Sequence, residues 1–227
     1  MPEINSIPYE NAEDLDKYLY DEYYSTEHIE EVTTGTGYLY KKLFELMLTT
    51  GVTQNSVCKT YYDLPYFNPV YGEAVWKCYV NDMDDCFAFF GFKETAADPT
   101  YNMVESHAGF MIYTDPEHSE LGGKLYASVA DGYTQQRVEI VGIDMTRVEN
   151  FKIEYNKFSI MPLPVIEEEL GLPTILSVER VWKLMTTLSV NPPENKVHYI
   201  VQYIKNTVGA DKKITFNRFI YKEVYAD

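Results

Sequence analysis

Short β-rich runs recur between residues 74 and 160, and they constrain the fold more than any other feature of the sequence. The run Cys86–Phe90 is apolar at every position, so it predicts a central strand whose two faces are both buried. The stretch Phe151–Ile160 alternates instead, as expected of a strand with one exposed face. The predicted strands are Ala74–Val80, Cys86–Phe92, Gly109–Thr114, Leu125–Ala130, Arg137–Ile143 and Phe151–Ile160.

These runs are joined by short connections, one of which contains the turn signal Asp131-Gly132. Six short strands with such connections favour antiparallel pairing. We therefore expect residues 54–161 to form a β-rich core, built as an antiparallel sheet, a sandwich or a partial barrel.

The residues before this core show helical spacing. After an extended arm in residues 1–10, Asn11 can cap a first helix, whose apolar positions are Ala12, Leu15, Leu19 and Tyr23. A second amphipathic helix is predicted from Leu39, Leu43, Leu46 and Met47, ending near Gly51. Residues 1–53 are thus expected to be an N-terminal arm and helical region.

The residues after the core also carry helical stripes. One consists of Val178, Val181, Trp182, Met185 and Leu188, and the next of Val197, Ile200, Val201, Ile204 and Val208. A strand or hairpin is expected in Lys213–Tyr225, so residues 162–227 predict a helix pair plus a terminal strand. The helices should pack through Val181, Trp182, Met185, Val201 and Ile204. The predicted fold class is α+β, in what is expected to be one composite domain.

Charge limits the partners of the chain. It has 35 acidic and 19 basic side chains and a net charge of −16, which disfavours direct binding to nucleic acid or to an anionic membrane. Residues 1–36 hold ten acids and one base, whereas residues 196–227 carry a net positive charge. This asymmetry suits a head-to-tail contact between subunits, although a solvated acidic face is the simpler alternative.

Tyrosine is unusually frequent, with 21 tyrosines against 11 phenylalanines. Tyrosine is enriched at protein interfaces, and ordinary packing at the edge of a core is the alternative. The candidate interface residues are Tyr18, Tyr20, Tyr23, Tyr24, Tyr61, Tyr62 and Tyr66. The expected partners are other protein subunits of the same assembly, in a homo-oligomeric ring or a hetero-complex.

Catalytic motifs are absent from the sequence. Asp82-Met83-Asp84-Asp85 resembles the start of a calcium loop, but Phe87 and Lys93 stand where an EF-hand needs glycine and glutamate. No nucleophile elbow, phosphate loop or dinucleotide fingerprint is present. We therefore predict no catalytic, cofactor-binding or metal-binding residue and no cofactor. A convergence of His107, Asp115, Glu117 and His118 is left open.

The three cysteines, Cys58, Cys78 and Cys86, are expected to be buried free thiols.

These features favour a non-enzymatic structural or assembly protein, most readily a tail, neck or baseplate component of a phage virion. The alternatives are an acidic inhibitor that mimics nucleic acid, and an enzyme whose His/Asp/Glu site lacks a known motif. The first residues have no secretory signal, and no apolar run approaches about 20 residues. The expected location is a virion assembled in the host cytoplasm, or otherwise the cytoplasm.

Overall fold

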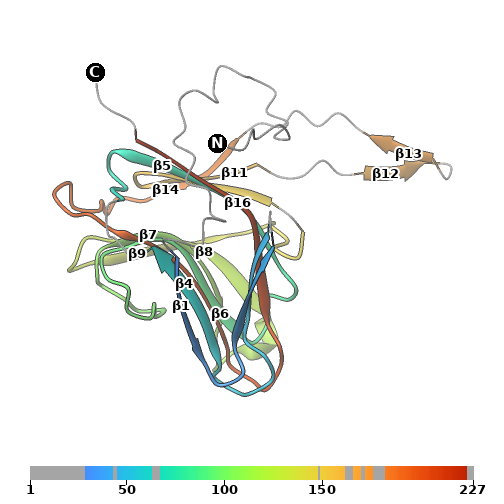
Figure 1. Cartoon of the computed structure of the whole chain (residues 1–227). Helices are drawn as coiled ribbons and strands as arrows, with labels where there is room; N and C mark the ends of the chain where they lie inside the picture. The colour runs from blue at the N-terminus through green and yellow to red at the C-terminus, as the bar shows by residue number, and fades with distance from the viewer. Residues whose placement is uncertain are drawn as a thin grey trace.

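The computed structural model describes residues 29–42, 45–62, 67–147, 149–161, 166–169, 172–175 and 182–223. In these residues the regular structure consists of sixteen β-strands and one short 3-10 turn, Ser119–Leu121. All the strand pairs are antiparallel, and fourteen of the strands form two seven-stranded sheets (Figure 1). The predicted α+β class is therefore wrong, and the chain is a β-sandwich.

The first sheet, here called the front sheet, has the strand order β1-β4-β15-β6-β7-β8-β9. Its strands are β1 (Ile29–Thr34), β4 (Val57–Tyr62), β15 (Tyr199–Asn206), β6 (Cys86–Lys93), β7 (His107–Thr114), β8 (Gly123–Ala130) and β9 (Gln135–Ile140). Strand β6, which contains the apolar run Cys86–Phe90, is the middle one, as its sequence predicted.

The back sheet has the order β14-β11-β10-β5-β16-β3-β2. Its strands are β14 (Lys183–Thr187), β11 (Lys157–Met161), β10 (Glu149–Glu154), β5 (Gly72–Val80), β16 (Lys213–Glu223), β3 (Glu45–Thr49) and β2 (Tyr38–Lys42). A separate hairpin pairs β12 (Ile166–Glu169) with β13 (Leu172–Ile175).

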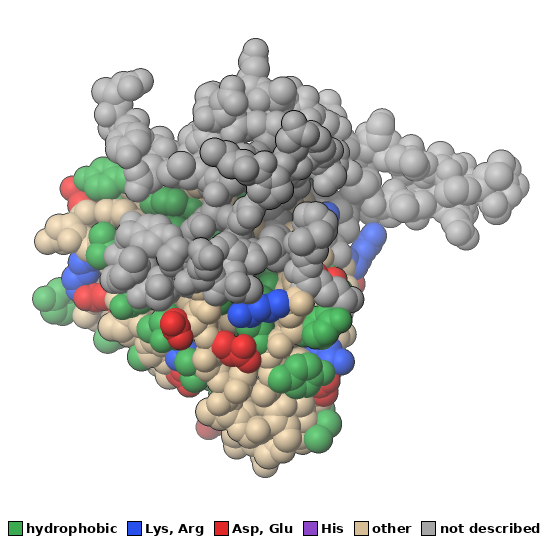
Figure 2. All heavy atoms as spheres, in the orientation of Figure 1, with side chains coloured by type: hydrophobic (Ala, Val, Ile, Leu, Met, Phe, Trp, Pro, Cys, Tyr) green, Lys and Arg blue, Asp and Glu red, His purple; other side chains and the backbone are tan. Residues whose placement is uncertain are grey.

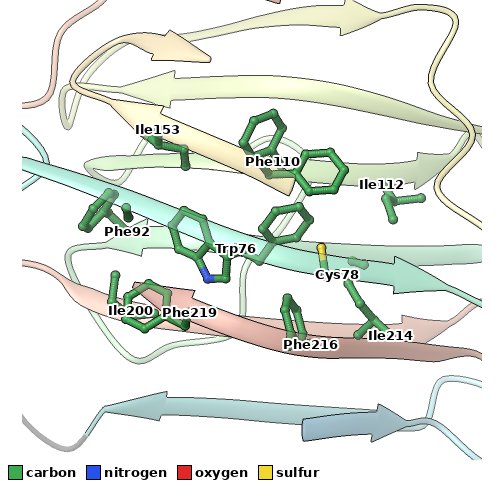
Figure 3. Close-up of a cluster of buried hydrophobic side chains, with 14 of the residues drawn as sticks. Trp76, Cys78, Phe92, Phe110, Ile112, Ile153, Ile200, Ile214, Phe216 and Phe219 are labelled. Atoms are coloured by element: carbon green, nitrogen blue, oxygen red, sulfur yellow. The ribbon is translucent and has the colours of Figure 1, made fainter. Parts of the chain in front are cut away.

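The main core lies between the inner faces of the two sheets and is rich in aromatic rings (Figure 3). Phe90 of the front sheet stacks on Phe110 at a centroid distance of 5.3 Å and meets Phe151 and Phe216 of the back sheet at 5.3 and 5.8 Å. Trp76 of β5 is fully buried in the same cluster. The three cysteines are also buried with free thiols, as predicted.

A second apolar cluster lies on the outer face of the front sheet. It consists of Val57, Phe87, Phe89, Met103, Met111, Val201 and Tyr203. Alternate residues of β6 supply both clusters, with Phe90 and Phe92 pointing inward and Phe87 and Phe89 outward. This second cluster explains why the run Cys86–Phe90 is apolar at every position.

The same two-sided burial explains why the last predicted helix is wrong. Ile200 and Ile204 of β15 face the main core, while Val201 and Tyr203 face the outer cluster. A strand buried on both faces has apolar residues at the spacings of a helical stripe, so the two are hard to distinguish by periodicity. β15 therefore replaces the expected helix around residues 197–208.

The second predicted N-terminal helix is replaced by β2 and β3, which form a hairpin of paired strands. Leu46 and Leu48 of β3 are buried at period two. The first predicted helix, in residues 11–24, lies outside the described residues.

The expected packing of a C-terminal helix pair is also wrong. β14 is an edge strand of the back sheet, whereas β15 lies inside the front sheet. Trp182 is half-buried just before β14. Val181 lies outside the described part of the chain.

The strand predictions in the middle of the chain are confirmed in place, with one change. The expected strand Phe151–Ile160 is a hairpin of β10 and β11, because the chain turns at Tyr155, whose φ is +60°. The terminal strand is confirmed as β16, which pairs with β3 and β5.

Candidate functional site

The connection between β6 and β7, residues 94–106, lies against the outer face of the front sheet. Its Met103 is 6% exposed and packs into the outer apolar cluster. Tyr101 stacks on Tyr113 of β7 with ring centroids 3.8 Å apart. These contacts make the segment, here called the cover loop, part of the packed structure.

Three basic side chains of the front sheet hold the cover loop. The ammonium group of Lys93 donates to the carbonyl oxygen and the Oγ1 of Thr95 and lies 2.5 Å from Glu105 Oε2. Lys93 is only 1% exposed. Burial is the main cause that lowers the pKa of Lys93, and Glu105 opposes this effect. The ammonium group of Lys93 is therefore bound by three oxygen atoms of the cover loop.

The other two cations come from β4 and β9, which lie on either side of β6 in the strand order. Lys59 of β4, 5% exposed, donates to Ala96 O at 2.8 Å and to Asp98 Oδ1 at 2.6 Å. Arg137 of β9 donates to the carbonyl oxygen of Tyr101 and, at 3.0 Å, to Asn102 Oδ1. The cover loop is thus tied to strands β4, β6 and β9.

Two buried histidines complete the base of the loop. His107 Nδ1 donates to Glu105 O at 2.7 Å, which leaves Nε2 to accept from Ser128 Oγ at 2.8 Å. His198 Nε2 lies 2.8 Å from Ser106 Oγ. Burial lowers the pKa of both histidines to about 4, so both are neutral at pH 7. They act here as structural hydrogen-bonding groups.

Two further segments meet the cover loop at one end of the front sheet (Figure 1). Lys196, in the segment 188–198, lies 2.6 Å from Glu94 Oε1, and its Nζ is 3.9 Å from the position of a Cβ on Gly132. In the turn 131–134, Asp131 Oδ1 accepts from the backbone N–H groups of Tyr133 and Thr134. We call residues 94–106, 131–134 and 188–198 the loop rim.

The loop rim presents groups of several kinds to solvent. Tyr133 is 89% exposed, the largest exposure among the large hydrophobic residues that the structure describes. Asn102 is also exposed, and Glu94 and Asp131 are half-buried. Backbone hydrogen bonds lower the pKa of Asp131, so this carboxylate stays ionised. The rim therefore carries an exposed aromatic ring, carboxylates and an amide.

The sequence-predicted candidates lie elsewhere or apart. His107 begins β7, while Asp115, Glu117 and His118 follow its other end and are exposed. A strand of that length separates its ends by roughly 20–25 Å, so the four residues do not converge. No group of three His, Cys, Asp or Glu side chains suited to a metal was found among the described residues.

Two of the seven interface tyrosines are described. Tyr61 is half-buried on the outer face of the front sheet, edge-on to Tyr199 at 5.8 Å. Tyr62 is 2% exposed in the main core. Tyr18, Tyr20, Tyr23, Tyr24 and Tyr66 lie outside the described residues. Contact with other protein subunits therefore stays a prediction.

Sequence reasoning missed the cover loop and its cations, although Lys93 carried a signal. A lysine directly after an apolar run, at the end of a central strand, must be paired with acceptors if it is buried. The six residues that supply those acceptors are scattered over the loop. Their convergence on three strands depends on the strand order, which the sequence does not show.

The chain resembles known proteins in fold but not in sequence. No family model matches the chain, and no curated protein matches it in sequence. Solved structures do match. The exoplasmic/lumenal domain of VIP36 in a Ca2+/Man2-bound form has a TM-score of 0.58 at 11% identity, covering 93% of this chain and 87% of that one. The legume lectin-like domain from Entamoeba histolytica has a TM-score of 0.56 at 10% identity, covering 87% and 91%. The potassium-bound carbohydrate recognition domain of Emp46p has a TM-score of 0.54 at 9% identity, covering 92% and 94%.

These matches span most of each chain, so the fold is a legume-lectin-like β-sandwich. At such identities they establish the fold alone. They overturn the expectation of a phage tail, neck or baseplate component, which had depended on helical ends and a β middle. The virion location is corrected with it, since the proteins that share the fold include an exoplasmic/lumenal domain. Within the described residues, no helix is long and apolar enough to span a bilayer.

Proposed function

We propose that this chain is a non-enzymatic carbohydrate-binding domain whose sugar site is the loop rim. The likeness in fold to carbohydrate recognition domains over most of the chain carries the proposal. One of those structures is named for bound Ca2+ and mannose units. The rim adds a local argument from chemistry.

A sugar ring combines apolar C–H faces with hydroxyl groups that donate and accept hydrogen bonds. Small-molecule sites commonly pair an aromatic surface with a few fixed polar groups. Tyr133 supplies the exposed ring, and Asp131, Asn102 and Glu94 supply oxygen acceptors or an amide. Ionised carboxylates form stronger hydrogen bonds with hydroxyl donors than neutral groups do.

The rim is also connected internally, which limits the ordering cost of binding. Gln135 Nε2 donates to Tyr101 O at 3.0 Å, which joins β9 to the cover loop. Gln136 Oε1 accepts from the backbone and hydroxyl of Ser189 and from Val190 N, which joins β9 to the segment 188–198. The three segments are thus held in one arrangement before a ligand arrives.

The same groups are poorly suited to glycoside hydrolysis. A hydrolase of that kind uses two carboxyl groups, one of which is a general acid with a raised pKa. Backbone hydrogen bonds lower the pKa of Asp131. For Glu105, burial alone would raise the pKa, but bonds from Lys93 and Thr95 outweigh it and lower the pKa. Both carboxyls support binding better than proton donation.

A glycan microarray with the purified chain tests the proposal, followed by calorimetry with the best glycan. Tyr133→Ala should weaken binding about tenfold or more, equivalent to about 1.4 kcal/mol. Tyr38→Ala is the matched control, because Tyr38 is an exposed tyrosine on β2 of the back sheet. Absence of any glycan ligand, or equal losses in both variants, would refute the site.

A further inference from the structure

The proteins that share this fold include a Ca2+/mannose-bound domain and a potassium-bound domain. The cover loop therefore raises the question of whether this chain could hold a metal ion at its proposed site. The donor chemistry of the loop answers it. Calcium takes six to eight oxygen ligands from carboxylates, carbonyls, amides and water. The cover loop is rich in such oxygens, but the chain's own cations already use them.

Seven oxygen atoms of the cover loop accept hydrogen bonds from Lys59, Lys93 and Arg137. They are Thr95 O, Thr95 Oγ1 and Glu105 Oε2 from Lys93, Ala96 O and Asp98 Oδ1 from Lys59, and Tyr101 O and Asn102 Oδ1 from Arg137. Carbonyl, hydroxyl, amide and carboxylate oxygens are all represented. They form three separate groups of two or three oxygens, because β4 and β9 lie two and three strands away from β6. Each group is bound by one ammonium or guanidinium group, and none supplies the six to eight oxygens of a calcium site.

A metal ion could not easily displace these basic groups. Lys93 and Lys59 are 1% and 5% exposed, so neither ammonium group can turn out to solvent without opening the loop. The ring of Tyr101 lies 3.6 Å from the guanidinium carbon of Arg137, which fixes the third cation by a cation–π contact. A divalent ion placed among these groups would be repelled by like charge in a poorly solvated site.

We infer that Lys59, Lys93 and Arg137 order the cover loop in place of a metal ion, so that the loop rim binds its ligand without calcium. Only the statement that the rim binds a ligand rests on the proposed function. The ordering of the loop by its own cations holds for the described residues whether or not the rim binds sugar. Its test can therefore be made without any carbohydrate.

The first experiment titrates the EDTA-treated full chain with CaCl2 in a calorimeter and measures its melting temperature with CaCl2 and with EDTA. We expect no binding at concentrations up to about 1 mM, the range of weak extracellular calcium sites, and equal melting temperatures. Calcium binding at or below that concentration, or a melting temperature that rises with calcium, would overturn the inference.

The second experiment measures hydrogen exchange of the cover loop in Lys93→Met. Exchange in residues 94–106 should rise at least tenfold, while β5 and β16 stay protected. Lys124→Met is the matched control, because Lys124 forms an exposed pair with Glu139 on the same sheet face. If Lys93→Met does not fold, Arg137→Gln provides the same comparison at a half-buried site. Unchanged exchange of the loop in the folded variant would contradict the inference.

Discussion

Lys93 Nζ lies 2.5 Å from Glu105 Oε2, and this ion pair closes the base of the cover loop between the end of β6 and the start of β7. The lysine side chain is almost fully buried, whereas the glutamate is about a quarter exposed, at 27%. The pair therefore joins a buried central strand to a surface loop. It is one of three cation contacts that hold the cover loop on the front sheet.

Glu105→Gln should destabilise the protein by about 3–5 kcal/mol, because it leaves the buried Lys93 ammonium without its counter-charge. Glu139→Gln removes the corresponding charge from an exposed pair with Lys124 and should cost at most about 1 kcal/mol. Urea unfolding of both variants measures the difference. Equal costs would show that the Lys93 pair is no stronger than a surface pair.

Stability should fall as the pH is lowered through the range where unfolded histidine takes up a proton. The pKa of His107 and of His198 is about 4 in the folded chain, against about 6.5 in an unfolded one. Between about pH 4 and pH 6.5 the unfolded state therefore binds more protons than the folded state. The stability that is fully present above about pH 6.5 is lost as the pH falls toward 4.

Each of the two histidines should remove roughly 2 kcal/mol between pH 6.5 and pH 5. Urea midpoints across that range check the slope. His107→Gln should reduce the slope, because it removes one of the two buried histidines. A midpoint that does not move with pH in the parent chain would contradict neutral burial of the histidines.

The two tryptophans should differ in their contribution to stability. Trp76 is fully buried between the sheets and contacts Phe90 and Phe219, so Trp76→Ala should cost about 3–5 kcal/mol. Trp182 is half-buried beside Lys152, so Trp182→Ala should cost only about 1 kcal/mol. Denaturant midpoints compare them, and a larger loss at Trp182 would contradict the assigned layers.

Gly109 is required by the outer cluster, because a Cβ at this position would lie 2.2 Å from the ring of Phe89. Gly109→Ala should destabilise the chain by about 1–3 kcal/mol through overpacking. Adding Phe89→Leu removes the ring and should recover part of the loss, so the two changes should not be additive. Additive losses in thermal unfolding would show that the ring is not the cause.

Much of the front sheet could be predicted from the sequence because its pattern is local. β6 is apolar on both faces and is the central strand, and the turn at Asp131 and Gly132 separates β8 from β9. β15 could not be assigned in the same way. Its residues Ile200, Val201 and Ile204 fit a helical stripe, and only the outer cluster explains why Val201 is apolar.

The candidate site could be predicted much less well. Lys59, Lys93 and Arg137 are separated by up to 78 positions in the chain, and they meet one loop only because β4, β6 and β9 share a sheet. Local patterns do not contain that information. The tyrosine count drew attention to residues 18–24 instead, which lie outside the described part of the chain.

The most direct test of the central claim is a nuclear magnetic resonance titration of the full chain with the glycan selected on the array. We predict that the largest amide shifts occur in the loop rim, at Asn102, Asp131, Tyr133 and Lys196, and that the strands of the back sheet do not shift. We also predict the same shifts with EDTA present. Shifts confined to the back sheet, or no shift with any glycan, would contradict the claim that the rim binds carbohydrate.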